Sequence, residues 1–175
     1  NPTTLTVNKE FYDELVELAK KYNFLVINDF AYSDIYFDEE KPPSLLNSDP
    51  ELEHTVELYS LTKGYSMAGW RVGFAIGNEN SISALTKIKS YIDYGTFQPI
   101  QIASTVAIND LDDYPKEVSS IYSERRSVAK EYLSKYGFAV QESNATMFVW
   151  AKMPNIYNND SMKFSLDLLS KSNVA

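Results

Sequence analysis

Lys63 stands among small hydroxyl residues in the stretch LYSLTKGYSMAGWRVGF (58–74), with Arg71 eight positions later. A lysine amine that burial or nearby cations keep neutral is a nucleophile for carbonyl carbon atoms. The guanidinium of Arg71, together with the hydroxyls of Ser60 and Thr62, forms a set of groups that binds phosphate. The stretch therefore predicts a phosphorylated carbonyl compound bound to Lys63.

A carboxylate follows the first predicted strand. Asp29 ends the apolar run FLVIND (24–29), and Ala31 and Tyr32 come after it. Ligands of open α/β sheets bind at the carboxyl ends of strands, and a carboxylate there can hold a protonated heterocycle. Combined with the amine of Lys63 and the phosphate-binding groups, Asp29 predicts pyridoxal phosphate, a phosphorylated aromatic aldehyde, as the cofactor.

Each of these signals alone has an ordinary structural explanation. A lysine after a strand is usually a solvated surface side chain. Asp29 alone fits a capping carboxylate, Arg71 alone fits a strand residue with its guanidinium in water, and NPTT (1–4) alone fits a turn. The order and spacing of the four signals together favour the cofactor site.

The composition excludes several other kinds of protein. The net charge is −8, with an isoelectric point of about 4.7, which disfavours nucleic acid and anionic membrane surfaces as partners. The chain has no cysteine and a single histidine, His54, so we expect no metal site. No apolar run has the length of roughly 18 residues that a membrane span needs.

The hydrophobic pattern predicts an α/β sheet followed by a separate α+β unit. Asn8 is placed to cap a helix over 9–22, and a proline-broken polar loop covers 37–51. The apolar side of this helix is predicted to consist of Phe11, Leu15, Leu18, Ala19 and Tyr22. Three buried strands are expected at 24–29, 54–61 and 71–77, and a strand, a turn and a strand at 138–154. Further helices are expected at 80–92, after a break at Pro99, at 115–135 and at 161–171.

Four motifs in this order resemble the class I aminotransferases of fold type I, which depend on pyridoxal phosphate. They are Asn-Pro at the start of NPTT, DFAY (29–32), SLTK (60–63) and GWRVGF (69–74). The interval from Lys63 to Arg71 matches the family, and the likeness covers nearly the whole chain. The stretches SYIDYGTFQPIQIA and ATMFVWAKMP are similar to the branch that includes glutamate–pyruvate (alanine) and LL-diaminopimelate aminotransferases.

The resemblance implies a division of the chain into three parts. Residues 1–114 would be part of a large domain with a mixed, mostly parallel sheet and helices on both faces, 115–136 a connecting helix, and 137–175 part of a smaller α+β domain. It also implies a cytoplasmic homodimer. Because the chain begins without methionine and lacks the family's ring-stacking aromatic residue and carboxylate-binding arginine, we expect a segment of a longer protein that alone binds the cofactor poorly and does not transaminate.

The resemblance also implies roles for individual residues. Lys63 would attach to the cofactor aldehyde and then carry the proton at the substrate Cα, and Asp29 would pair with the ring nitrogen. Tyr32 and Asn1 would hydrogen-bond to the ring oxygen.

The phosphate would be bound by Ser60 and Arg71, with Thr62 a weaker candidate. Thr4 stands where the family usually has glycine, so we expect the NPTT turn to depart from the glycine-type conformation.

The implied reaction moves an amino group between an amino acid and a 2-oxo acid. No arginine occurs in 90–103, where the resemblance places the arginine that dicarboxylate-specific members of the family use. We therefore favour an alanine or glutamate–pyruvate type, with aspartate and diaminopimelate types close behind. Arg125 and Arg126 on the long helix are expected to lie in solvent. Two alternatives stay open: a pyridoxal-phosphate-dependent C–S lyase, and a non-catalytic fragment that retains the fold.

Overall fold

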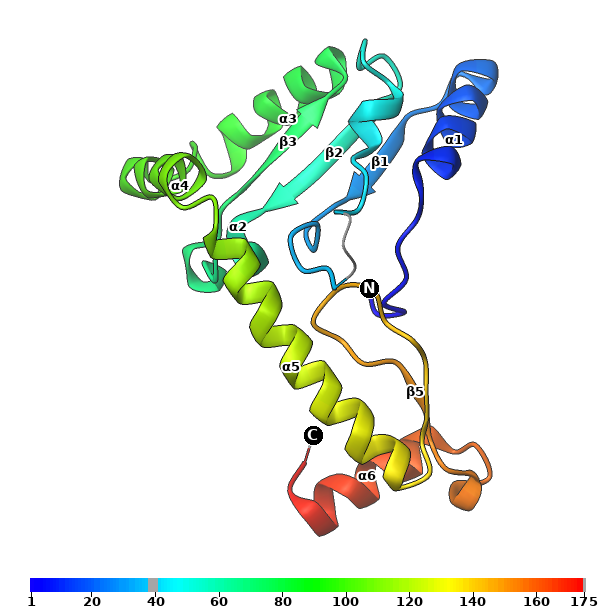
Figure 1. Cartoon of the computed structure of the whole chain (residues 1–175). Coiled ribbons are helices and arrows are strands. Elements are labelled where there is room, and N and C mark those ends of the chain that lie inside the picture. The colour runs from blue at the N-terminus through cyan, green and yellow to red at the C-terminus, as the bar shows by residue number, and fades with distance from the viewer. Residues whose placement is uncertain (38–40, 175) are drawn as a thin grey trace.

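The computed structural model describes residues 1–37 and 41–174. Within these residues, the first part of the chain contains a three-stranded mixed sheet (Figure 1). β1 (Val26–Asp29) pairs in parallel with β2 (Thr55–Ser60), and β2 pairs antiparallel with β3 (Gly73–Gly77). The predicted α/β class with a mixed sheet is confirmed. The expected burial of the strands holds only in part, since the side chains of Ile27, Phe74 and Ile76 are exposed.

The first helix packs on the sheet through a face that overlaps the predicted one only in part. α1 (Lys9–Tyr22) begins after Asn8, whose side chain accepts a hydrogen bond from the backbone of Phe11 at 3.1 Å, as the sequence predicts. Tyr12 and Val16 are buried against Leu45, whereas Phe11 is exposed. Ala19, which belongs to the predicted side, is also fully buried, so the core-facing stripe keeps this residue and is displaced by one position from Phe11 and Leu15.

The remaining elements are short helical turns, most of them between the strands, and longer helices that follow β3. Short helical turns occur at η1 (Leu45–Ser48), α2 (Leu61–Gly64), η2 (Ala68–Trp70) and η3 (Asn155–Tyr157). The first of these lies within the predicted loop 37–51, of which residues 38–40 are outside the described part. Longer helices are α3 (Glu79–Ile92), α4 (Gln98–Asp110), α5 (Tyr114–Lys135) and α6 (Ser161–Ser172). Pro99 lies in the first turn of α4 rather than before it, because the first backbone N–H groups of a helix need no partner within it.

Helix α5 runs from the sheet toward the C-terminal part of the chain (Figure 1). That part contains the antiparallel pair β4 (Ala139–Val140) and β5 (Ala151–Lys152), followed by α6. The predicted strand, turn and strand are therefore present, but both strands are short. The boundaries of the three predicted parts, 1–114, 115–136 and 137–175, stay a prediction.

The C-terminal part returns to the sheet through a backbone bridge. Tyr36 and Ala145 form an antiparallel bridge, in which Phe37 N–H donates to the Asn144 carbonyl and Thr146 N–H to the Ile35 carbonyl, each at 2.8 Å. This bridge brings residues 144–146 beside the segment that follows Asp29.

Arg126 reinforces this bridge from α5, so the expectation that it lies in solvent is wrong. Its guanidinium donates a hydrogen bond to the Ser143 carbonyl and lies 4.3 Å from the ring centroid of Phe37. Arg125, in contrast, is exposed as expected. The two adjacent arginines therefore have different roles in the same helix.

We expect the change Arg126→Ala to lower the free energy of unfolding by about 1–2 kcal/mol, because it removes a charge-assisted hydrogen bond and a cation–π contact. Arg125→Ala is the control: it removes only an exposed cation–π contact with Tyr122, at 5.5 Å, and is expected to lower the same free energy by about 0.5 kcal/mol at most. Chemical denaturation followed by circular dichroism measures both. Equal effects of the two changes would contradict the role given to Arg126.

No helix in residues 1–37 and 41–174 combines the length and the apolar character needed to cross a membrane. In the same residues, no cluster of three or more histidine or acidic side chains is arranged to hold a metal ion.

Candidate active site

A cleft of about 350 Å³ opens at the carboxyl end of β1. Three of the predicted cofactor-binding residues line it, namely Asn1, Asp29 and Tyr32. The C-terminal part of the chain contributes Ala145 and Thr146, which the bridge to residues 35–37 brings there. The cleft is thus built from segments far apart in the sequence.

Asp29 lies at the end of β1 and is exposed. One of its carboxylate oxygens accepts a hydrogen bond from the backbone N–H of Ala31 at 3.3 Å, which begins a series of tight turns. In these turns Ser33 N–H donates to the Phe30 carbonyl and Ile35 N–H to the Tyr32 carbonyl. The carboxylate therefore faces the cleft while it also fixes the start of the following loop.

Tyr32 connects the cleft to Lys63. The Lys63 ammonium lies 5.4 Å from the centroid of the Tyr32 ring, a cation–π distance. On the C-terminal side, the Tyr32 ring packs against Phe148 with centroids 5.5 Å apart. Sequence reasoning did not find Phe148, because a contact over more than a hundred positions leaves no local pattern.

Lys63 lies in the one-turn helix α2, which begins directly after β2. The Ser60 hydroxyl accepts a hydrogen bond from the backbone of Thr62 at 3.2 Å and donates one to the Val72 carbonyl at 3.4 Å. Ser60 thereby ends the strand and holds the segment next to Arg71. Lys63 is half-buried rather than fully buried.

Arg71 does not open β3 as predicted. It has a left-handed backbone conformation (φ 54°) at the end of η2, and its exposed side chain donates to the Ala68 carbonyl at 3.2 Å. The residues that line the cleft include neither Arg71 nor Ser60, Thr62 and Lys63. The structure therefore gathers Asn1, Asp29 and Tyr32 at one cleft, sets Lys63 against Tyr32, and places the predicted phosphate-binding residues beyond it.

Thr4 keeps the conformation that glycine favours, so the expected departure of this turn is wrong. Its φ is 66°, its side chain is fully buried, and its hydroxyl has no hydrogen-bond partner among the described residues. A non-glycine residue in the left-handed region is strained, and an unpaired buried hydroxyl adds a further cost. The packing around the NPTT turn therefore imposes the backbone conformation against the preference of the residue.

We expect Thr4→Gly to raise the free energy of unfolding by about 1 kcal/mol, because it relieves the backbone strain and removes the unpaired hydroxyl. The control is Thr3→Gly at the exposed neighbouring position, which gains backbone freedom in the unfolded chain and is expected to lose a few tenths of a kcal/mol. Thermal unfolding measures both. A Thr4→Gly protein less stable than the Thr3→Gly protein would refute this explanation.

A comparison with protein-family models matches the whole chain, residues 1–175, to the class I and II aminotransferase model. The chain belongs to this family. Members of the family generally depend on pyridoxal phosphate and act on amino acids and 2-oxo acids. The predicted family is therefore confirmed.

Three relatives illustrate the similarity. An LL-diaminopimelate aminotransferase of Natranaerobius thermophilus is 42% identical over 174 residues, which cover 99% of this chain and 45% of the relative. The glutamate–pyruvate aminotransferase AlaC of Escherichia coli is 41% identical over 175 residues, which cover 99% of this chain and 42% of the relative. The solved structure of N-succinyldiaminopimelate aminotransferase from Mycobacterium tuberculosis superposes with a TM-score of 0.92 at 29% identity, over 100% of this chain and 46% of that one.

The chain thus spans less than half the length of these relatives. The match nevertheless runs through both the sheet and the C-terminal part, so the fold described above is that of the corresponding part of an aminotransferase.

Proposed function

We propose that the protein is a pyridoxal-phosphate-dependent aminotransferase that moves an amino group between an amino acid and a 2-oxo acid. The observation that carries the proposal is the joint placement of Asn1, Asp29 and Tyr32 at one cleft, with the Lys63 amine against the Tyr32 ring. The match of all 175 residues of this chain to the family model supports it.

The groups around the cleft suit pyridoxal phosphate. The cleft volume of about 350 Å³ lies within the usual range of small-molecule sites, roughly 300–1,000 Å³. The Asp29 carboxylate suits the pyridine nitrogen, and the Tyr32 phenol and the Asn1 amide suit the ring oxygen. The Lys63 amine, which lies against the Tyr32 ring, suits the aldehyde.

We assign the residues as follows. The Asp29 carboxylate accepts a hydrogen bond from the protonated ring nitrogen, and the Tyr32 hydroxyl and the Asn1 amide donate to the ring oxygen. When bound, the cofactor supplies an aldehyde carbon for the amino group and a ring that stabilises negative charge on the substrate Cα. The Lys63 amine would hold the cofactor through its aldehyde and, as the free amine, would hold and return the proton at the substrate Cα.

The phosphate is assigned to Ser60 and Arg71, with Thr62 a weaker candidate. Ser60 bonds to the carbonyl of Val72, the residue after Arg71, so the hydroxyl and the guanidinium come from adjoining segments. The Arg71 guanidinium uses one nitrogen for the Ala68 carbonyl, and its remaining N–H groups are suited to a phosphate.

For the substrate we favour an alanine or glutamate–pyruvate type, supported by AlaC among the relatives, with aspartate and diaminopimelate types close behind. We expect the 175-residue chain alone to bind the cofactor weakly, because it spans less than half of the relatives' length. The cytoplasmic location stays a prediction.

The central test uses the product of the whole gene, incubated with pyridoxal phosphate and reduced with borohydride. We expect peptide mass spectrometry to find the reduced cofactor on Lys63, and Lys63→Ala to lower kcat at least about 100-fold, because the proton at Cα loses its acceptor. Lys87→Ala, at an exposed position of α3, is the control and should leave both unchanged.

The products separate the proposed reaction from its alternatives. Amino transfer forms one amino acid for each 2-oxo acid consumed, whereas a C–S lyase releases ammonia and pyruvate. A cofactor that attaches to Lys63 without any turnover indicates a non-catalytic protein. Attachment that persists unchanged in the Lys63→Ala protein contradicts the assignment of Lys63.

We also propose a homodimer, for which the exposed aromatic residues before and at the start of α4 provide support. Tyr94 is 92% exposed and Phe97, three positions later, is 71% exposed, an unusual state for large aromatic side chains. We expect Tyr94→Ser with Phe97→Ser to weaken dimerisation at least about tenfold, since large aromatic residues often dominate interfaces. Sedimentation equilibrium measures the dimer affinity. The control is Tyr136→Ser, at a 67% exposed position at the C-terminal end of α5. Equal dimer affinity in the double variant and in the control would refute this interface.

A further inference from the structure

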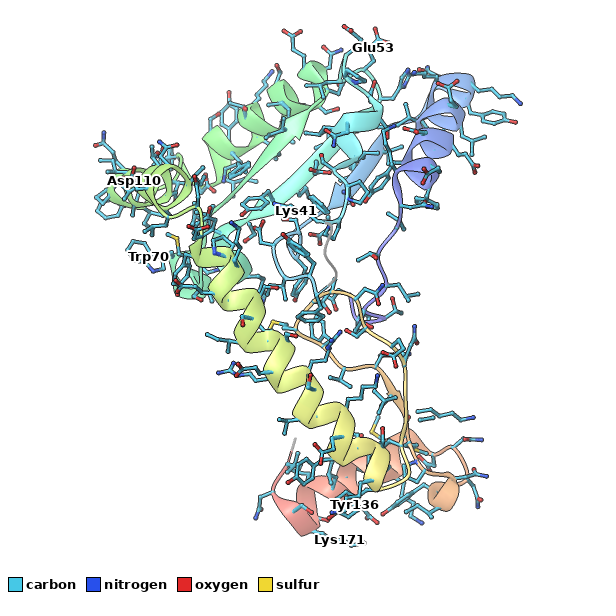
Figure 2. The ribbon with its side chains drawn as sticks, in the orientation of Figure 1. Lys41, Glu53, Trp70, Asp110, Tyr136 and Lys171 are labelled. Carbon is cyan, nitrogen blue, oxygen red and sulfur yellow. The ribbon has the colours of Figure 1, made fainter. Side chains whose placement is uncertain are left out.

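Asp34 is a buried carboxylate to which the proposed chemistry gives no role. It is 8% exposed and lies in the loop that carries Asp29 and Tyr32. One of its oxygens accepts a hydrogen bond from the Tyr59 hydroxyl, and the other pairs with the Lys41 ammonium at 2.8 Å. The Lys41 side chain, labelled beside the sheet in Figure 2, is half exposed, whereas the hydrogen bond from the Tyr59 hydroxyl is part-buried.

The contacts of Asp34 lie on both sides of the segment that carries Lys63. Tyr59 directly precedes Ser60, and Gly64 directly follows Lys63. A Cβ atom built on Gly64 would come within 2.7 Å of a carboxylate oxygen of Asp34, which is too close for any side chain. The carboxylate therefore contacts both the residue before Ser60 and the residue after Lys63.

The hydrogen bond between Tyr59 and Asp34 persists over the physiological pH range. Burial raises the pKa of the Tyr59 hydroxyl, and its bond to the Asp34 carboxylate raises it further. Burial and the same carboxylate also raise the pKa of Tyr65, which lies close by. Both phenols consequently stay protonated, and the carboxylate always has a neutral donor.

Asp34 also belongs to the loop that positions the cleft. The backbone turn from Tyr32 to Ile35 contains it, and the bridge between Tyr36 and Ala145 follows at once. A carboxylate fixed to this loop and bonded to Tyr59 therefore sets the distance between the Asp29–Tyr32 side of the site and the Lys63 side.

We propose that Asp34 is a positioning residue that holds the Lys63 segment in register with the loop of Asp29 and Tyr32. This inference rests on the proposed function, because it gives Asp34 the task of placing the Lys63 amine at the cofactor aldehyde. A displacement of about 1 Å in such a geometry costs about 100-fold in rate.

The hydrogen bond of Asp34 with Tyr59, rather than its ion pair with Lys41, holds the Lys63 segment in position. Lys41 is half exposed, and exposed ion pairs contribute little to stability. The Asp34–Tyr59 bond is part-buried, with Asp34 itself only 8% exposed, and it joins the two segments directly. An asparagine at position 34 retains an acceptor for Tyr59, whereas an alanine does not.

The test compares variants of the whole-gene product at a temperature at which all are folded. We expect Asp34→Ala and Tyr59→Phe to slow attachment of pyridoxal phosphate to Lys63 by about 10- to 100-fold. Asp34→Asn and Lys41→Ala should stay within about threefold of the unchanged protein. Attachment is measured by borohydride trapping and peptide mass spectrometry.

A second readout separates positioning from a merely structural role. The visible circular dichroism of the attached cofactor reports its fixed orientation, and we expect it to fall in Asp34→Ala and Tyr59→Phe but to be retained in Asp34→Asn. Thermal unfolding verifies that each variant is folded. Should Asp34→Ala fail to fold, Tyr59→Phe carries the test, because it removes a single hydroxyl and leaves the ring that packs 4.9 Å from Phe74.

The outcomes distinguish this inference from the proposed function. If the unchanged protein attaches no cofactor at Lys63, the proposed function is wrong and the role of Asp34 with it. If the unchanged protein attaches the cofactor but Tyr59→Phe matches it in rate and in circular dichroism, Asp34 is not a positioning residue and the proposed function stands.

Discussion

The parallel pairing of β1 with β2 is the constraint on which the site depends. It sets Asp29 opposite Leu58, so both strands end at the same edge of the sheet. The loop after β1 then carries Tyr32, and the helical turn after β2 carries Lys63. Two segments about thirty positions apart thereby present a carboxylate, a phenol and an amine to one region, which an antiparallel pairing would have placed at opposite edges.

The pairing fixes the two strand ends but not the loops that follow them, and other contacts supply that order. Ser60 holds its own helical turn and reaches the Val72 carbonyl. Asp34 joins the loop after β1 to both flanks of the turn after β2. The bridge from Tyr36 to Ala145 adds the C-terminal part of the chain to the wall of the cleft. The rigidity of the site thus comes from hydrogen bonds between loops, built on a short sheet.

The features that depend on neighbouring residues could be predicted from the sequence. Asn8 as a helix cap, the helices at 80–92 and 115–135, and the order of the motifs around Asp29 and Lys63 all rest on local patterns. The errors have local physical causes as well. Pro99 was expected in a loop before the helix but lies in its first turn, and Arg71 has a left-handed backbone where a strand was expected.

The contacts between distant segments could not be predicted. Asp34 and Tyr59 are 25 positions apart, and nothing in the composition of either segment indicates their bond. Arg126 resembles its exposed neighbour Arg125 in the sequence, and only the fold places Phe37 and Ser143 beside it. The strained backbone of Thr4 likewise follows from packing that overrides the preference of a single residue.

A crystal structure of the whole-gene product with pyridoxal phosphate would show directly whether the site binds the cofactor as proposed. We expect continuous electron density from the Lys63 amine to the cofactor, a hydrogen bond between the Asp29 carboxylate and the ring nitrogen, and the phosphate against Ser60 and Arg71. A cofactor joined to another lysine, or bound with its ring nitrogen away from Asp29, would contradict it.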